Sequence, residues 1–81
     1  MDELKQYIIE KLEEASGIDN ITDASLLFEE EILNSLSILY LVGELEERYS
    51  IQIPLEDVIE DNFCDVNHIA MYLEKKIKGD K

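Results

Sequence analysis

A serine at position 35 is the residue best placed to do chemistry in this sequence. It stands in the segment Glu-Ile-Leu-Asn-Ser-Leu, residues 31–36, where a long polar stretch gives way to a strongly apolar one. A hydroxyl in the first turn of a helix is accessible to a partner enzyme. A phosphate attached there would face the positive end of the helix dipole and its unpaired N–H groups. Position 35 is therefore a candidate attachment site for a phosphate-linked group.

The other reactive residue types lack partners at a useful spacing. Cys64 is the only cysteine and His68 the only histidine, so no cysteine cluster or second histidine completes a metal site. One histidine without an evident nucleophile is also poor support for catalysis. The acidic stretch 19–31 differs from an EF-hand loop, because Ile21 would take its third position and Ala24 its sixth. We expect no catalytic residue and no specific metal site.

Helical periodicity predicts the elements that position the serine. A first helix over about residues 2–16 has an apolar stripe of Leu4, Tyr7, Ile8, Leu12 and Ala15. A second helix runs from Asn34 or Ser35 to about Tyr49, with a stripe of Ile38, Leu41, Val42, Leu45 and Tyr49. A short third helix is expected at about 55–60, and a fourth at about 66–78, with a stripe of Val66, Ile69, Leu73 and Ile77.

Capping residues set two of these helix starts. Asn34 is a good N-cap, since its side-chain oxygen can accept a bond from the backbone N–H of Leu36 or Ser37, which places Ser35 at the first helical position. Asp65 can cap the fourth helix in the same way. Pro54 disfavours helix at the residue before it and suits the entrance to the third helix.

Two longer connections complete the predicted fold. Residues 17–34 read as a loop pinned over the helices by its apolar side chains, namely Ile18, Ile21, Leu26, Leu27 and Phe28. Residues 50–55 alternate like a strand, but no second strand-like segment can pair with them, so an extended loop is expected. The predicted fold is an all-α four-helix bundle with a long connection between the first two helices, formed by residues 1–81 as one domain.

Charge restricts the partners of this domain. The chain has 20 acidic and 7 basic residues, a net charge of -13, and 46% hydrophobic residues. This balance excludes the usual electrostatic footprint of nucleic-acid binding, disfavours anionic membranes and favours partners with basic surfaces. With one cysteine, no basic leader and no apolar run long enough to span a membrane, the chain reads as a cytoplasmic monomer.

The segment around Ser35 resembles the carrier proteins of fatty-acid, polyketide, nonribosomal-peptide and D-alanine-transfer systems. Those proteins have Asp-Ser-Leu at the start of their second helix, and here Glu-Ile-Leu-Asn-Ser-Leu-Ser is followed by Leu-Tyr-Leu-Val-Gly-Glu-Leu-Glu-Glu-Arg-Tyr. The resemblance continues through Ile51, Ile53 and Pro54 and covers nearly the whole chain. It implies a four-helix fold of acyl-carrier type and a 4′-phosphopantetheine arm, donated by coenzyme A, on Ser35. The arm would hold acyl or aminoacyl groups as thioesters.

The resemblance also implies partners and roles for the flanking residues. A phosphopantetheinyl transferase would add the arm, ligases or transferases would load it, and Leu36 would contact partner enzymes. Asn34 stands where the family usually has aspartate. Both types cap helices about equally well, but a charge-assisted contact from Asn34 to a basic residue of the transferase would be weakened. We therefore expect modification to be slow or to need a dedicated transferase.

Two surfaces are candidates for docking basic partners. The second helix presents Leu36, Leu39 and Gly43 along one face. Acidic residues flank this face or extend it at the third helix, namely Glu44, Glu46, Glu47 and Glu56. Complementary charge mainly raises association rates and selects partners. Alternatively, these acidic residues do not bind a partner and are simply solvated. For Glu46 and Glu47 the two interpretations are equally supported.

Two questions of function stay open at this point. A small acidic adaptor or inhibitor that binds a basic partner without modification is the alternative to a carrier, and it would need neither Ser35 nor a transferase. The cargo is the second question. The Phe-Glu-Glu-Glu-Ile-Leu approach to Asn34 and the run Ile-Gln-Ile-Pro at 51–54 look closer to D-alanyl carrier proteins than to fatty-acid carriers.

Overall fold

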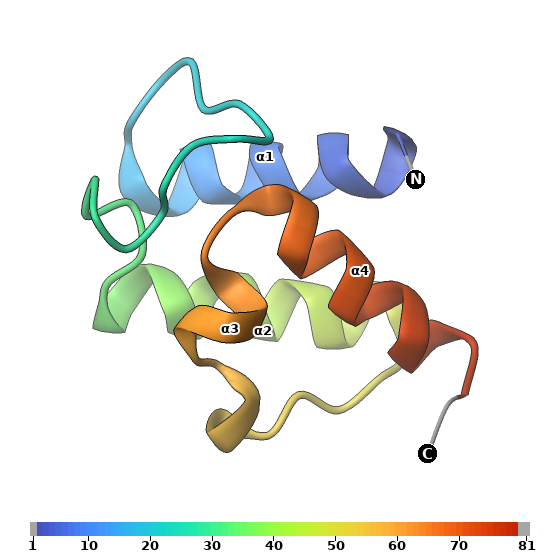
Figure 1. Ribbon diagram of the computed structural model, residues 1–81. Helices are drawn as coiled ribbons and strands as arrows, with labels where there is room; N and C mark the ends of the chain where they lie inside the picture. Colours follow the sequence, from blue (N-terminus) through green and yellow to red (C-terminus); the bar gives the residue numbers. More distant parts are fainter. Residues whose placement is uncertain (1, 80–81) are drawn as a thin grey trace.

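Four α-helices and one short 3-10 helix form the part of the chain, residues 2–79, that the computed structural model describes (Figure 1). The elements are α1 (Asp2–Ser16), α2 (Ser35–Tyr49), the 3-10 helix η1 (Leu55–Asp57), α3 (Glu60–Phe63) and α4 (Val66–Ile77). Within the described range no residue lies in a β-strand, so the predicted all-α class is confirmed. The bounds of α1, α2 and α4 match the predicted ranges to within one residue.

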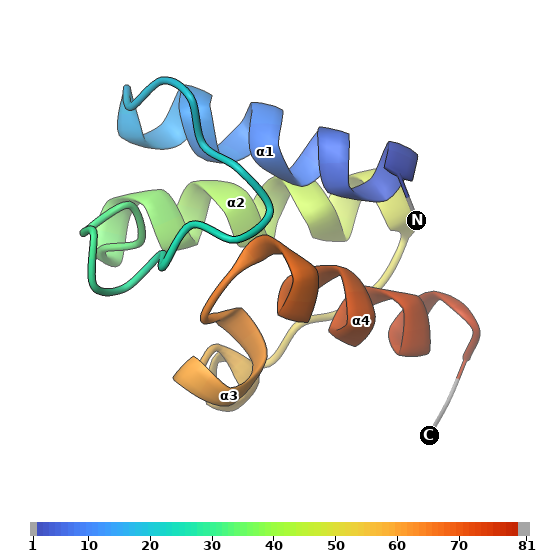
Figure 2. The same ribbon diagram turned by 45° about the horizontal axis from the view of Figure 1, so that its top comes forward.

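The first, second and fourth helices enclose the core. α1 packs against both α2 and α4, and α3 packs against α4 (Figures 1 and 2). α1 and α2 run in opposite directions, and an edge-to-face contact between the rings of Tyr7 and Tyr49 joins them, with 5.9 Å between ring centroids. The fully buried side chains come from the predicted apolar stripes, from α3 and from the connection between α1 and α2. They include Ile8, Leu12, Leu27, Ile32, Leu41, Leu45, Phe63, Val66, Ile69 and Leu73.

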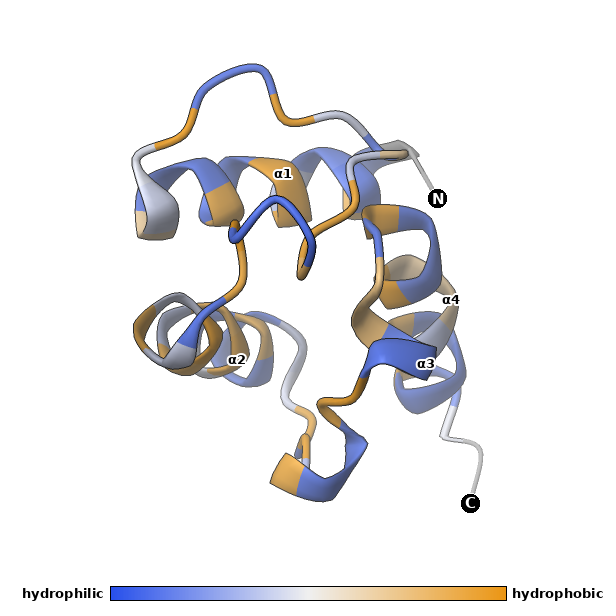
Figure 3. Ribbon diagram, turned by 60° about the vertical axis from the view of Figure 1, so that its left-hand side comes forward, coloured by the Kyte–Doolittle hydropathy of each residue, from blue (hydrophilic) through white to orange (hydrophobic). Residues whose placement is uncertain are grey.

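The connection between α1 and α2 is pinned, as predicted, but partly by other residues. Ile21 and Leu27 are buried and Phe28 is half-buried, whereas Ile18 and Leu26 are 39% and 46% exposed, so their anchoring role was predicted wrongly. Ile32 and Leu33, just before α2, are buried instead and were missed. Figure 3 shows the resulting alternation of hydrophobic and hydrophilic residues along this connection.

Backbone hydrogen bonds explain why the connection has a defined path. The N–H of Leu27 donates to the carbonyl of Cys64, at 2.9 Å, so the loop is joined to the α3–α4 junction. The side chain of Asn67 donates to the carbonyl of Asp23, at 3.1 Å, which joins the loop to α4. These bonds satisfy polar groups that would otherwise be left unpaired beneath the loop.

The third helix is shorter than predicted and begins later. Instead of one helix at 55–60, the chain makes one turn of 3-10 helix, η1, and then the four-residue α3. Val58 (φ -87°, ψ 71°) and Ile59 (φ -125°, ψ 168°) leave helical geometry between the two elements. After this step α3 packs against α4, and Phe63 is fully buried beside the ring of Tyr72. Ile77, in the last turn of α4, is also more exposed than its place in the stripe predicted.

Candidate functional site

The start of α2 has the predicted geometry. Asn34 is in extended conformation, with φ -140° and ψ -176°, and Ser35 is the first residue of the helix. The side-chain oxygen of Asn34 accepts bonds from the N–H groups of Leu36 and Ser37, each at 3.0 Å. The N-cap prediction is therefore confirmed for both donors that it named. Because the cap fixes the first turn, it also fixes where the Ser35 side chain leaves the helix.

Ser37 completes the cap and was missed by sequence reasoning. Its side chain is 1% exposed, and its hydroxyl accepts from the N–H of Asn34 at 2.8 Å while donating to the carbonyl of Ile32 at 2.8 Å. The Asn34 and Ser37 pair is a reciprocal capping box. A polar residue three positions after the cap was the available signal, although such boxes usually have glutamate or glutamine there.

The loop before the cap also holds it in place. Ile32 and Leu33 are buried in the core, and the N–H of Leu33 donates to the carbonyl of Leu27 at 3.0 Å. Glu31 has a positive φ of 60°, which reverses the chain before it enters the core. Asn34 and Ser35 thus follow two apolar anchors and remain at the surface, where both are exposed.

The electrostatic surroundings suit an anion on Ser35. The first turn of α2 has no acidic residue, and the positive end of the helix dipole lies there. The Leu36 and Ser37 N–H groups are already bonded to Asn34, which corrects the expectation that unpaired N–H groups would receive the phosphate. The benefit for a phosphate on Ser35 therefore comes from the helix dipole rather than from these two donors.

The apolar residues proposed for docking lie on the surface. Leu36 is 79% and Leu39 63% exposed, which is high for large hydrophobic side chains. Gly43, one turn further along, is exposed, and a Cβ built on it would meet no atom within 4 Å. Close helix packing therefore does not explain this glycine. The three residues give α2 an open apolar strip that begins beside Ser35.

The acidic residues proposed for docking divide into free and engaged groups. Glu47 and Glu56 are exposed. Glu44 lies 3.6 Å from the ammonium group of Lys11 on α1, and Glu46 accepts a bond from the N–H of Ile53 at 2.8 Å. Glu46 thus holds the segment after α2 through one carboxylate oxygen, and its role in docking stays a prediction.

The segment around η1 contains further surface residues that the sequence analysis did not single out for docking. Leu55 is 72% exposed and Ile59 is also exposed, next to Glu56. Asp57, in contrast, accepts a bond of 2.6 Å from the hydroxyl of Tyr72 on α4. Burial, followed by this bond to Asp57, raises the pKa of the Tyr72 phenol well above its usual range. Asp57 therefore ties η1 to α4 instead of facing a partner.

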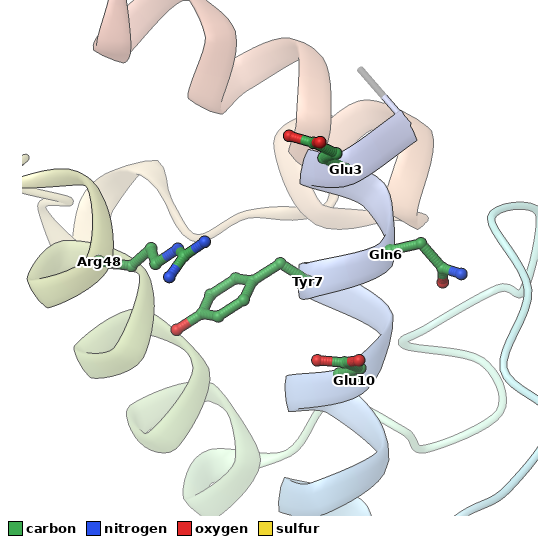
Figure 4. Close-up of a pocket in the computed structure, with 5 residues that line it drawn as sticks. All are labelled: Glu3, Gln6, Tyr7, Glu10 and Arg48. Carbon is green, nitrogen blue, oxygen red and sulfur yellow. The ribbon is translucent and has the colours of Figure 1, made fainter.

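A surface depression of about 440 Å³ lies far from Ser35. It is lined by Glu3, Gln6, Tyr7 and Glu10 of α1 and by Arg48 of α2 (Figure 4). The ring of Tyr7 points toward α2, and the Arg48 guanidinium lies 4.9 Å from the ring centroid. Arg48 is near the other end of α2, about 20 Å along the helix axis from Ser35. The depression is therefore separate from the start of α2.

Comparisons with known proteins identify the family of this chain. The family described as phosphopantetheine attachment site matches residues 3–62. An acyl carrier protein of Brachyspira hyodysenteriae is 33% identical over 78 residues, which are 96% of each chain. D-alanyl carrier proteins of Bacillus mycoides and Bacillus cereus are 31% identical over 77 residues, covering 93% of this chain and 98% of theirs. As for membranes, none of the helices in the described residues is long and apolar enough to cross one.

Proposed function

The chain belongs to the family of phosphopantetheine-dependent carrier proteins, and from this premise we propose that Ser35 is the residue to which the arm is attached. Proteins of this family carry acyl or aminoacyl groups between partner enzymes. The attached arm supplies a terminal thiol on which these groups are held as thioesters. Residues 1–81 are proposed to act together as one carrier domain.

The observation that carries the proposal is the contrast between Ser35 and Ser37. Both lie in the first turn of α2, but the Ser37 hydroxyl is buried and bonded on both sides, while Ser35 is exposed. Only an exposed hydroxyl can enter the active site of a modifying enzyme. The Asn34 cap and the two buried residues before it hold Ser35 at the positive end of the helix dipole, where a phosphate is favoured.

The chain itself is proposed to have no catalytic role. Carrier proteins of this family are generally not catalytic, and the chemistry is done by the enzymes that they visit. Ser35 acts as the attachment point, and α2 fixes its position. A tethered thiol has a high local concentration at a docked active site, so that weak and reversible docking is enough for transfer.

Partners of such carriers include a phosphopantetheinyl transferase and the ligases or synthases that load or use the cargo. We propose that they dock on the strip of Leu36, Leu39 and Gly43, with Glu47 and Glu56 selecting basic surfaces. The carrier acts as a monomer in the cytoplasm, where coenzyme A is available as the arm donor. Because Asn34 is neutral, its transferase cannot depend on an ion pair at this position, and a dedicated enzyme is expected.

The attachment site is tested by intact mass spectrometry after a long incubation with coenzyme A and a broad-specificity transferase, because modification by such an enzyme is expected to be slow. We expect a gain of about 340 Da, the mass of the arm. Ser35→Ala should abolish this gain. Ser50→Gly is the matched control, since Ser50 is an exposed serine at the other end of α2 whose φ of 55° suits glycine. A gain that persists in Ser35→Ala would place the arm elsewhere.

An unmodified acidic adaptor that binds a basic partner is the alternative function, and the same experiment separates the two. Such an adaptor would keep its mass with every transferase, including one encoded beside it. It would also bind its partner equally well with and without the Ser35 hydroxyl. A carrier, in contrast, loses all transfer of cargo when that hydroxyl is removed.

A small aminoacyl cargo is proposed because the core side chains are shielded from solvent. The side chains between α2 and α4 are fully buried, namely Leu41, Leu45, Phe63 and Ile69. A long acyl chain would have to displace such side chains to enter the bundle, whereas an aminoacyl group can stay in solvent. Thermal melts of the modified protein with an acetyl, an alanyl and a long acyl thioester test this. A long chain that raises Tm above the other two would contradict the proposal.

A further inference from the structure

Three side chains of metal-binding type come together where α3 meets α4. One ligand atom from each of Cys64, Asp65 and His68 lies within 4.8 Å of the others. We propose that this group binds Zn²⁺ or a similar transition-metal ion through the thiolate of Cys64, a carboxylate oxygen of Asp65 and Nδ1 of His68. The sequence did not predict this site, because Cys64 and His68 have no second cysteine or histidine. The third ligand is Asp65, which was considered only as the cap of α4.

The geometry needs only a small adjustment to receive an ion. Tetrahedral zinc has bonds of about 2.3 Å to sulfur and about 2.0 to 2.2 Å to nitrogen and oxygen, which separates its ligands by about 3.3 to 3.7 Å. The Asp65 carboxylate and His68 Nδ1 are now 2.7 Å apart and hydrogen-bonded. Rotations that move the side-chain atoms by about 1 Å would replace this bond with two bonds to the metal.

The scaffold beneath the three ligands is already ordered. The Asp65 carboxylate accepts from the N–H of His68 at 2.8 Å, so it is held at the first turn of the twelve-residue helix α4. The Cys64 carbonyl accepts from the N–H of Leu27, which fixes the backbone at the other side of the cluster. Two of the ligands, Cys64 and Asp65, are half-buried, and His68 is exposed and can admit the ion.

The ligand types select the class of metal. A thiolate, an imidazole and a carboxylate suit Zn²⁺ and related transition metals, and three protein ligands leave a fourth position for water. Calcium and magnesium require several oxygen ligands, and in this cluster only the Asp65 side chain supplies oxygen. Binding transfers the thiol proton of Cys64 to solvent, while His68 binds as the neutral ring. The net charge of -13 raises the local concentration of any cation.

Metal binding would act on the loop that leads to Ser35. The ligands lie at the junction whose Cys64 carbonyl holds Leu27, and the Leu27 carbonyl in turn holds Leu33, just before the α2 cap. An ion at the junction therefore stabilises the segment that positions Ser35 without touching that residue. The site is a structural one, separate from the attachment site.

The test uses the unmodified full chain, checked by mass, so that no second thiol is present. We expect a thiolate-to-cobalt absorption band with Co²⁺ and an increase in Tm with Zn²⁺. Cys64→Ser and His68→Gln should each weaken Zn²⁺ binding by more than about tenfold, because even indirect supports of metal ligands are worth that much. Asp61→Asn, an exposed acidic residue close by in the sequence, is the matched control and should bind Zn²⁺ like the parent chain.

Two results would overturn the proposal. One is the absence of the cobalt band, and the other is an equal Tm increase with Zn²⁺ in all variants, which would show diffuse attraction of cations to the acidic surface. Mg²⁺ should raise Tm to the same extent in every variant. If a variant does not fold, alkylation of Cys64 in the parent chain tests the proposal instead. One equivalent of Zn²⁺ should slow this alkylation, and an unchanged rate would contradict the site. Because the unmodified chain is used, the outcome does not depend on whether Ser35 is the attachment residue.

Discussion

α2 and α4 both begin after a side-chain N-cap, but the two helix starts differ in function. Each follows an Asn or Asp cap in extended conformation, and each is joined to the connection between α1 and α2. At α2 the cap is neutral and the next residue presents an exposed hydroxyl. At α4 the cap, Asp65, is charged and half-buried. Its carboxylate is bonded to the backbone N–H of His68 and to the ring of His68.

The difference shows what a helix start needs in order to carry a group. At α2 the cap uses Asn34 and a buried serine, so the stabilising contacts do not involve the Ser35 hydroxyl. At α4 the reactive side chains themselves take part in the local contacts. The first arrangement suits covalent attachment, and the second suits a fixed junction. The following predictions test this distinction in order of decreasing effect.

Replacing Ser35 should have the largest effect on function and almost none on folding. Ser35→Ala removes the only exposed hydroxyl in the first turn of α2, so modification should be lost completely. The side chain supports no part of the cap, and the free energy of unfolding should change by less than about 0.5 kcal/mol. Mass spectrometry and urea unfolding measure the two quantities. A large loss of stability would show that the site is not independent of the fold.

Replacing Ser37 should have the opposite profile. Ser37→Ala leaves the Asn34 N–H and the buried Ile32 carbonyl without their partner, which costs about 1 to 3 kcal/mol. Modification should persist at a reduced rate, because the hydroxyl of Ser35 is still present but its helix turn is less ordered. Urea unfolding and the rate of mass gain are the measurements. Stability equal to that of the parent chain would remove Ser37 from the cap.

These two serines also show how far the sequence predicts the site. Capping is local, so the spacing around Asn34 was enough to place Ser35 at the first position of α2. The engagement of Glu46 by Ile53 and of Asp57 by Tyr72 depends on how the chain turns after α2, which periodicity does not report. The bond that holds Glu46 was therefore not visible in the sequence.

The prediction of one helix at about 55–60 was wrong because it, too, depends on how distant parts of the chain pack. The chain leaves helical geometry at Val58 and Ile59, two β-branched residues of lower helix propensity, and Phe63 beyond them is buried where α3 packs on α4. The exposed Ile18 and Leu26 show the same limit, since composition alone does not say which apolar residues of a loop reach the core. The bounds of the three longer helices were predictable because their apolar stripes are continuous.

Removing the cap of α4 should cost less than removing Ser37. Asp65→Ala loses the bond from the His68 N–H and the contact with the exposed His68 ring, and the lost cap is worth about 1 kcal/mol. Burial acts to raise the pKa of Asp65, but the bonds from His68 outweigh it, so the pKa lies below its usual value. The charged form therefore stabilises the fold above the unfolded-state pKa, and this contribution is lost as the pH falls through the lower folded value.

Thermal or urea unfolding of Asp65→Asn across the acidic range checks that sign. The parent chain should be more stable than the variant at neutral pH, and the two should converge below the folded pKa of Asp65. Because asparagine can still cap, the difference isolates the charge. Curves that diverge as the pH falls would contradict the assignment. Asn34→Ala provides the comparison at α2, where no such dependence on acid is expected from the neutral cap.

Gly43 should separate stability from docking on the open side of α2. Gly43→Ala should stabilise the helix by up to about 1 kcal/mol, because the added Cβ meets no atom and the residue lies in the helix interior. If partners dock on the strip with Leu36 and Leu39, the same change should slow transfer of the arm or cargo. Unfolding and transfer rates are measured on one preparation. Increased stability with unchanged transfer would remove Gly43 from the docking strip.

The smallest effect on stability is expected when the neutral cap of α2 is given the charge found at α4. Asn34→Asp keeps the oxygen that accepts from Leu36 and Ser37, so unfolding should change by less than about 0.5 kcal/mol. A transferase that contacts this position with a basic residue should act faster on the variant, because the contact becomes charge-assisted. A dedicated transferase should act faster on the parent chain. For each enzyme, the modification rate of the Asn34→Asp variant divided by that of the parent chain therefore reports how the enzyme recognises this side chain, with the helix unchanged. Equal rates on the parent and variant chains for both enzymes would show that Asn34 serves only to hold Ser35 in place.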